Sequence, residues 1–232
     1  MNIFKGFIMS KTIKIAKERQ DYLFKELSSL LEALASPVRL KIIHFLSQAP
    51  HSVEQLSIKL GQSIANTSMH LKKMQREKIL KTESLGQKRI YSLAQDEMKE
   101  FWEQIQNFAY SHNSSNVISS SEIYNEDFKW HKDLEETIKM IKARKLTLLD
   151  VRPHDEIDDI DSTYKKYVLH IPFENLKKLM DSLPTSRPIL IICRGRLCVM
   201  SNESAFQLRK LGFDVYKFDF SWYQISKKLI EV

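Results

Sequence analysis

The sequence has few cysteines and no long apolar run. Its 232 residues contain two cysteines, Cys193 and Cys198, which excludes the disulfide framework of a small secreted protein. No apolar run approaches the roughly 20 residues that cross a bilayer. The first residues, where Met9 is an alternative start to Met1, lack the apolar core and small-residue cleavage site of a signal peptide. These absences predict a cytoplasmic protein with no membrane partner.

The chain is long enough for one large domain or two small ones, and its positive charge is uneven. Residues 1–110 carry 17 Lys and Arg against 11 Asp and Glu, whereas residues 111–232 carry 19 against 18. The densest part is 72–89, with seven basic residues and two acidic ones. A basic stripe is often only a solvated face, but this concentration favours a polyanionic partner.

A polar, serine-rich stretch at 111–127 is the best candidate for a linker. It predicts one domain at 1–110 and another at 128–232. In the first domain, apolar spacing and capping patterns predict successive helices, the last of them at about 95–108. A hairpin with its turn at Gly86-Gln87 is expected before that last helix. A short helix, a turn, a second helix and a basic hairpin together indicate a mainly α-helical winged helix-turn-helix domain.

Ala33–Ile43 and Ser63–Lys72 are two segments of this domain that resemble the ArsR family of bacterial repressors. Ala33–Ile43 is similar to the family signature, Ser63–Lys72 is similar to its recognition helix, and the likeness covers about residues 25–95. The resemblance implies a homodimeric repressor whose recognition helix lies in the major groove of a double-stranded DNA operator. Apolar stripes on the first and last helices suit a dimer interface, or alternatively close the core of the monomer.

The residues expected to contact DNA form two groups. At the start of the recognition helix, Asn66 can pair with adenine, and Thr67 and Ser68 are short enough for close approach to base edges. Basic residues on this helix and on the hairpin are expected to contact phosphates. The full predicted set is Ser63, Ala65, Asn66, Thr67, Ser68, His70, Lys72, Lys73, Arg76, Lys88 and Arg89. Family metal sensors carry cysteines on the preceding helix, and because 53–58 has none, we expect no metal and no cofactor.

From residue 130 onward, helical patterns alternate with short apolar strands. This alternation predicts an α/β domain with a small, largely parallel sheet. Strands are expected at 146–151, 167–171, 189–192 and 214–218. Helices are expected at 130–142, 174–182 and 201–211, with an acidic loop at 155–161.

Cys193 follows the apolar strand 189–192 and precedes a helical pattern. At such a position, backbone N–H groups and the helix dipole favour an anion, and Arg194 and Arg196 add positive charge. We therefore expect an exposed, nucleophilic thiolate. A buried structural cysteine is the alternative.

Leu148–Arg152 and Cys193–Val199 resemble the rhodanese family, over about residues 128–232. The resemblance implies that Cys193 takes sulfur from a sulfane donor and becomes a persulfide. Backbone N–H groups of the loop around Gly195 would hold the persulfide. Arg194 and Arg196 would bind the anionic donor, and Arg152 would lie near the loop. Related phosphatases place an arginine six residues after the cysteine, where this chain has Val199, which disfavours phosphatase activity. The chain departs from rhodaneses at 163–167, where they often carry Gly-His-Ile-Pro-Gly, and at 218–222, where they have a glycine-rich turn.

Cys198 has two interpretations. In the first, Cys198 resolves a persulfide or sulfenate of Cys193 into a disulfide, which requires the two Cα atoms to lie within about 7 Å. In the second, Cys198 is a small packing residue at the end of the loop. The whole chain has three interpretations. It is a repressor that senses sulfane sulfur or another thiol-reactive small molecule at Cys193, a sulfurtransferase with an autoregulatory DNA-binding domain, or a regulator whose silent rhodanese-like domain binds a ligand.

Overall fold

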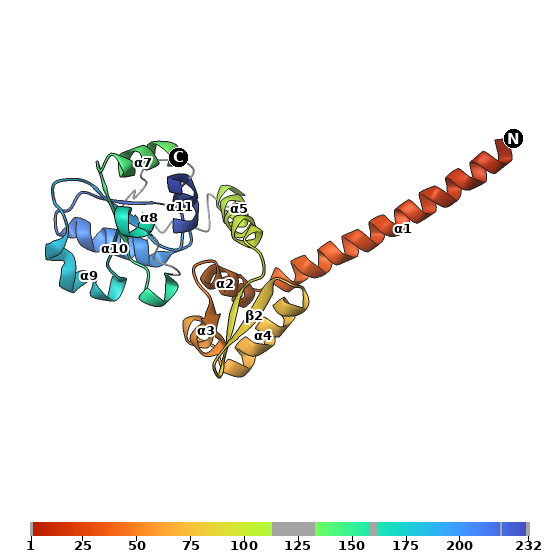
Figure 1. The fold of residues 1–232 in the computed structure, drawn as a ribbon, viewed down its shortest axis with the longest axis horizontal. Coiled ribbons are helices and arrows are strands. Elements are labelled where there is room, and N and C mark those ends of the chain that lie inside the picture. The colour runs from red at the N-terminus through yellow and green to blue at the C-terminus, as the bar shows by residue number, and fades with distance from the viewer. Residues whose placement is uncertain (1, 113–132, 158–161, 219, 231–232) are drawn as a thin grey trace. The chain divides into compact units, whose positions relative to one another are not determined.

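The computed structural model describes residues 2–112, 133–157, 162–218 and 220–230, and its contacts divide the chain into two units (Figure 1). The first unit comprises residues 1–43 and 51–94, and the second comprises residues 44–50 and 95–232. Helix α2 (Pro37–Leu46) therefore begins in the first unit and ends in the second. The expected linker lies outside the described residues, except for its first two.

The first unit combines helices with a three-stranded antiparallel sheet. Its remaining elements are α1 (Asn2–Leu34), β1 (His51–Ser52), α3 (Val53–Leu60), α4 (Ile64–Arg76), β2 (Leu80–Leu85) and β3 (Lys88–Leu93). The strand order is β1-β3-β2, and the short β1 was not expected. Leu85 pairs with Lys88, so Gly86, at φ +61°, and Gln87 form a two-residue turn. The predicted winged helix-turn-helix is confirmed.

Both helices of the helix-turn-helix begin at a capping serine. The Ser52 hydroxyl accepts from the Gln55 N–H at 3.3 Å, and the Gln55 side chain accepts from the Ser52 N–H at 2.8 Å, which is a capping box. The Ser63 hydroxyl accepts from the Asn66 N–H at 3.2 Å at the start of α4. The buried core of this unit includes Ile42, Leu56, Leu71, Met74 and Ile79.

Between residues 13 and 31, helix α1 leaves most of its apolar side chains exposed in the single chain. Ala33 and Leu34 at its end are buried, but five residues before them are 47–65% exposed: Tyr22, Leu23, Phe24, Leu27 and Leu31. The end of the helix is fixed by Arg39, whose guanidinium donates to the carbonyls of Ala33 at 2.6 Å and Glu32 at 2.9 Å. The end of the apolar stripe of α1 therefore contributes to the core of this unit, whereas its more N-terminal members at Leu23, Leu27 and Leu31 remain exposed.

The second unit contains a four-stranded parallel sheet with the order β5-β4-β6-β7. Its strands are β4 (Thr147–Asp150), β5 (Val168–His170), β6 (Ile189–Ile192) and β7 (Val215–Lys217). The predicted α/β class and parallel sheet are confirmed. Its helices are α5 (Glu97–His112), α7 (Leu134–Lys142), α8 (Ser162–Tyr167), α9 (Phe173–Leu179), α10 (Val199–Lys210) and α11 (Trp222–Ile230), with 3₁₀ turns η1 (His154–Glu156) and η2 (Met180–Ser182).

Successive residues of a strand point to opposite sides of the sheet. Because the strand residues are apolar on both sides, helices cover both faces of this sheet. Leu149 and Ile191 lie in an apolar cluster with residues of α9 and α10, whereas Leu148 and Leu190 lie in another with residues of α7 and α11. Helices α8 and α11 were not expected from the sequence. With both faces covered, the carboxyl edge of the strands is the place where connecting loops can form a site.

Helix α5 is grouped with the α/β unit, whereas the sequence predicts that residues up to 110 belong to the first domain. Trp102 of α5 is buried, and its ring centroid lies 6.0 Å from that of His44. Glu100 forms an ion pair with Lys227 of α11 and accepts from the Tyr223 hydroxyl at 3.3 Å. These contacts tie α5 to residues 44–50 and to the C-terminal helix within one unit.

Candidate functional site

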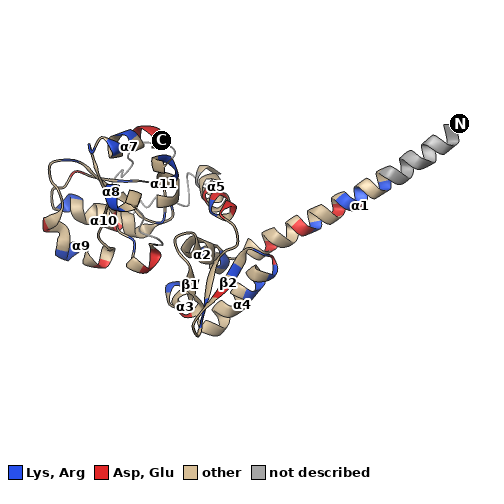
Figure 2. Cartoon of the chain, viewed as in Figure 1, with Lys and Arg blue, Asp and Glu red and all other residues tan. Residues whose placement is uncertain are grey.

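The candidate DNA-contacting surface comprises α4 and the β2–β3 hairpin, where Figure 2 shows basic residues. The predicted residues Ser63, at the N-cap of α4, and Ala65, Lys72 and Arg76, on α4, are exposed. Asn66, Ser68, His70 and Lys73 of the same helix are half-buried. Lys88 and Arg89 are exposed at the start of β3. The structure therefore brings ten of the eleven predicted residues to the surface of one unit.

Thr67 is the exception, and its predicted contact with a base edge is wrong in this structure. The residue is fully buried, and its hydroxyl has no hydrogen-bond partner among the described residues. Thr67 precedes the buried Leu71 and Met74 by four and seven positions, so all three lie on the inner face of α4. The neighbouring Asn66 amide donates to the Gln62 side chain at 2.6 Å, which fixes it at the start of the helix.

Two other predicted residues interact with the body of the first unit. Lys73 lies 2.6 Å from a carboxylate oxygen of Glu32, and this hydrogen-bonded ion pair lowers the pKa of Glu32. Arg39 lies 3.5 Å from Nδ1 of His70, and burial, followed by the charge of Arg39, lowers the pKa of His70. Part of the Lys73 charge is thus neutralised within the protein, which makes Lys73 a weaker candidate for phosphate contact than Lys72.

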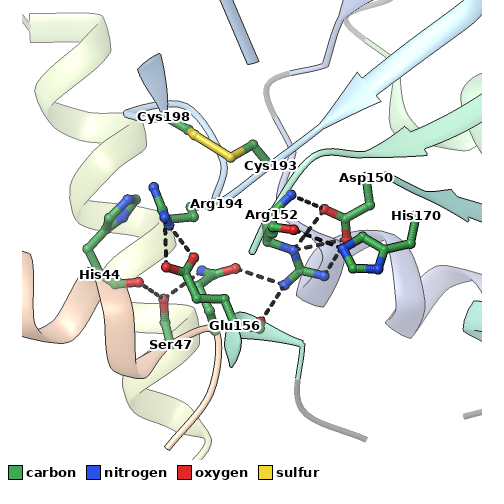
Figure 3. A network of polar contacts seen from close by, with 10 residues as sticks. His44, Ser47, Asp150, Arg152, Glu156, His170, Cys193, Arg194 and Cys198 are labelled. Carbon is green, nitrogen blue, oxygen red and sulfur yellow. Dashed lines mark hydrogen bonds and ion pairs between the residues drawn. A yellow bond between two sulfur atoms is a disulfide. The ribbon is translucent and has the colours of Figure 1, made fainter. Parts of the chain in front are cut away.

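In the second unit, the two motifs of the sequence meet at the carboxyl edge of the sheet (Figure 3). Asp150 at the end of β4 pairs in register with Ile192 at the end of β6. The Val151 N–H donates to the Ile192 carbonyl at 3.2 Å. Arg152, two residues after β4, and Cys193, directly after β6, therefore follow neighbouring strands at the same edge of the sheet.

Cys193 and Cys198 form a disulfide, with their Cα atoms 6.3 Å apart. Gly195 has φ +97°, a conformation that favours glycine, and its carbonyl accepts from the Cys198 N–H at 3.1 Å. Cys198 is the N-cap residue of α10. The two cysteines are 1% and 2% exposed. The expected exposed thiolate is therefore not present in this state, because both sulfur atoms are bonded and buried.

Arg194 forms an ion pair with the fully buried carboxylate of Glu156, through Nε and, at 2.7 Å, through a terminal nitrogen (Figure 3). Its guanidinium carbon lies 5.2 Å from the ring centroid of Phe45, in the range of a cation–π contact. In this state the Arg194 side chain is thus engaged by Glu156, and its expected role in binding an anionic sulfur donor stays a prediction. Burial raises the pKa of Glu103, and the charge of the nearby Arg196 offsets part of this increase.

Arg152 and Asp150 form a buried ion pair beside this loop. The guanidinium donates to both carboxylate oxygens at 2.6–3.1 Å, and the Tyr164 hydroxyl donates to the same carboxylate at 2.9 Å. Burial, and next the charge of Asp150, raise the pKa of Tyr164, so it remains protonated as a donor. Removing one partner of such a buried pair costs roughly 3–5 kcal/mol. The ion pair of Arg152 with Asp150 therefore stabilises the end of β4.

The structure gives the conformation of the stretch 163–167, which is expected to stand where rhodaneses often carry Gly-His-Ile-Pro-Gly. These residues belong to α8, whereas His170, Ile171 and Pro172 come at and after the end of β5. Nε2 of His170 lies 2.8 Å from the Arg152 carbonyl. Sequence reasoning therefore missed His170, although its His-Ile-Pro sequence was a signal that could have identified it.

Across the residues that the structure describes, no group of three or more His, Cys, Asp or Glu side chains is arranged to hold a metal ion. Within the same ranges, none of the helices combines the length and apolar character needed to cross a membrane.

The first unit defines the class of this protein: it carries a winged helix-turn-helix. Residues 36–82 match the family described as bacterial regulatory protein, arsR family. The chain therefore contains an ArsR-family winged helix-turn-helix, the DNA-binding domain of bacterial transcriptional regulators. This match ends before the α/β sheet begins, so the resemblance of residues 128–232 to rhodaneses stays a prediction.

Several known proteins are similar to this chain. The HTH-type transcriptional regulator Rv0324 of Mycobacterium tuberculosis is 24% identical over 204 residues, which cover 87% of this chain and 88% of the relative. The solution structure of the homodimeric winged helix-turn-helix domain of Mb0332 from Mycobacterium bovis is 21% identical, with a TM-score of 0.40, and covers 43% of this chain and 93% of that one. Reduced HlyU from Vibrio cholerae is 27% identical, with a TM-score of 0.36, and covers 39% of this chain and 96% of that one.

Proposed function

We propose that this chain is a transcriptional regulator, acting as a repressor, that binds a double-stranded operator through α4 and the β2–β3 hairpin. Its affinity for DNA is controlled by the thiol chemistry of Cys193 and Cys198 in a rhodanese-like domain. The observation that carries this proposal is the cysteine pair, bonded at the carboxyl edge of the sheet in a chain that also contains an ArsR-type helix-turn-helix. The M. tuberculosis relative, named a transcriptional regulator, aligns over both units.

The proposed signal is a sulfane-sulfur donor such as a polysulfide. In the reduced chain, the Cys193 thiolate attacks the terminal sulfane sulfur, and the S–S bond of the donor breaks with its electron pair leaving on the shortened polysulfide. The Cys198 thiolate then attacks the Cys193 sulfur of the persulfide and releases hydrosulfide. Two thiols are thereby oxidised to a disulfide, one sulfane sulfur is reduced to hydrosulfide, and the thiol protons pass to solvent.

The operator-binding form is proposed to be a homodimer. The exposed apolar residues of α1 include Leu23, Leu27 and Leu31, which recur every four residues and so lie along one face of the helix. Pairing this face with a second copy would remove it from water. A two-fold symmetric dimer in turn predicts an operator with two half-sites about one helical turn apart.

The test is the DNA affinity for the gene's own upstream region at one fixed salt concentration, because phosphate contacts make affinity depend on salt. Reduced and polysulfide-treated protein are compared, with Cys193→Ser and, as matched control, Cys198→Ser, which can form the persulfide but not the disulfide. We expect treatment to change the affinity about tenfold or more, or about 1.4 kcal/mol, and both variants to lose the response that depends on the disulfide.

The same samples distinguish the alternatives. A sulfurtransferase would turn over thiosulfate or polysulfide in a manner that requires Cys193, with DNA affinity unchanged by treatment. A regulator with a chemically silent domain would show neither turnover nor a thiol-dependent response. Either pattern would refute thiol control of DNA binding.

A further inference from the structure

The disulfide loop is linked by side chains to the segment that joins α2 to β1. We propose that Arg194 and Glu156 transmit the oxidation state of Cys193 to residues 44–50, and through the continuous chain to the helix-turn-helix. This inference rests on the proposed function above, because it assigns the route by which the cysteine pair controls DNA binding. All the contacts involved lie within the second unit, to which residues 44–50 belong.

The first connection runs from the disulfide to Phe45. Arg194 directly follows Cys193 in the sequence, so its backbone position depends on how the loop is closed. Its guanidinium is held between the carboxylate of Glu156 and the ring of Phe45. Because Glu156 is fully buried, a displacement of Arg194 would remove part of the positive charge that compensates its carboxylate. The loop position and the contact with Phe45 are thereby energetically coupled.

The second connection runs from Glu156 to Gln48. Arg152 donates from one terminal nitrogen to the Glu156 carbonyl at 3.4 Å and to the Gln48 side chain at 3.1 Å. The Gln48 amide donates to the Ser47 hydroxyl at 3.0 Å, which in turn donates to the His44 carbonyl at 2.9 Å. Glu156 is therefore linked to the segment by two routes. Its carboxylate binds Arg194, which contacts Phe45, and its backbone carbonyl accepts from Arg152, which contacts Gln48 (Figure 3).

Residues 44–50 are well placed in the sequence to carry such a signal. They contain the last turn of α2 and the residues immediately before β1, which is followed directly by α3 of the helix-turn-helix. In the disulfide state the segment is held at Phe45 and Gln48. Reduction removes the covalent closure of residues 193–198, which frees Arg194 to leave Glu156 and releases that hold. The reduced and disulfide forms can then differ in DNA affinity, because residues 44–50 are held in the disulfide form and released in the reduced form.

The test uses the full chain with Glu156→Gln, which keeps the shape of the side chain but removes its charge. Glu135→Gln is the matched control, because Glu135 makes an ion pair on the surface of the same unit, with Lys228 at 3.3 Å. Three quantities are measured in reduced and oxidised protein: the number of free thiols, the amide hydrogen exchange of residues 44–50, and the operator affinity. Phe45→Leu is a second variant, which keeps an apolar side chain but removes the ring.

In the wild type and in Glu135→Gln, we expect reduction to speed exchange at residues 44–50 by about tenfold, or about 1.4 kcal/mol of local stability. Glu156→Gln and Phe45→Leu should still form the disulfide by thiol count, but should lose most of the redox difference in both exchange and DNA affinity. The inference is overturned if both variants keep the wild-type differences, or if DNA affinity responds while residues 44–50 do not. If DNA affinity is insensitive to oxidation in the wild type, the proposed function itself fails.

Discussion

His44 makes the stability of the second unit depend on pH in a predictable direction. It lies in the last turn of α2, beside the rings of Phe45 and Trp102, and its Nδ1 is buried with no hydrogen-bond partner among the described residues. Burial, followed by repulsion from Arg194, lowers its pKa from 6.5 to about 4, against a smaller opposing effect of Glu156. The folded protein therefore holds His44 neutral at pH values where the unfolded chain protonates it.

The sign and size of the effect follow from proton linkage. The folded pKa is depressed, so the contribution to stability is fully present above pH 6.5 and is lost as pH falls from 6.5 toward 4. With pKa values of 6.5 unfolded and about 4 folded, the loss in unfolding free energy between pH 7 and pH 5 is about 2 kcal/mol. Other groups titrate in the same range, so the quantity to compare is the difference between the wild type and His44→Gln.

Urea denaturation at pH 7 and pH 5, followed by tryptophan fluorescence, measures this difference, since the buried Trp102 lies in the same unit. His44→Gln should lose about 2 kcal/mol less than the wild type on acidification. His112→Gln, at an exposed position of α5, serves as the control and should behave as the wild type. Equal losses in all three proteins, or an NMR titration that places the pKa of the His44 imidazole near 6.5, would refute the reasoning.

Three further predictions concern the first unit. Thr67→Val should leave DNA affinity within about twofold of the wild type, since its hydroxyl is buried and unbonded among the described residues; a large loss would show that Thr67 does reach the DNA. Lys72→Ala should reduce the salt dependence of DNA binding by about one phosphate contact. Lys73→Ala should reduce it less, because Lys73 is already paired with Glu32. Equal reductions in the two variants would contradict this difference. Leu27→Lys should lower the mass measured by light scattering from dimer to monomer, and an unchanged mass would exclude this face of α1 from the interface.

Local rules were sufficient to predict the helix-turn-helix and the hairpin of the first unit and the class of the second. The capping serines at 52 and 63 and the Gly86-Gln87 turn act over a few residues, so their effect can be read from the sequence. Strands such as 189–192 are buried on both faces and are therefore continuously apolar. The juxtaposition of Arg152 and Cys193 was also expected in outline, because both follow neighbouring parallel strands.

The partners of the site residues could not be predicted in the same way. Glu156 is 38 positions away from Arg194 and lies in an acidic stretch that indicates a solvated loop, yet its carboxylate is buried. Burial of that kind depends on tertiary packing, which sequence spacing does not reveal. Helix α11 differs, because Trp222, Ile225 and Leu229 have helical spacing, and this signal was overlooked. Thr67 was misassigned because the polarity of its side chain was given more weight than its position on the inner face.

The way α2 is shared between the two units restricts how this protein can be divided or recombined. A fragment that begins at residue 128, the expected start of the α/β domain, would lack Gln48, Phe45 and Trp102, which the second unit takes from earlier in the chain. Such a fragment would lose side chains that pack against its own disulfide loop. A chimera that replaces the α/β domain by joining a new domain within 111–127 would likewise keep α5 and residues 44–50 while discarding their partners. Grafted versions would therefore need to exchange these segments together with the sheet.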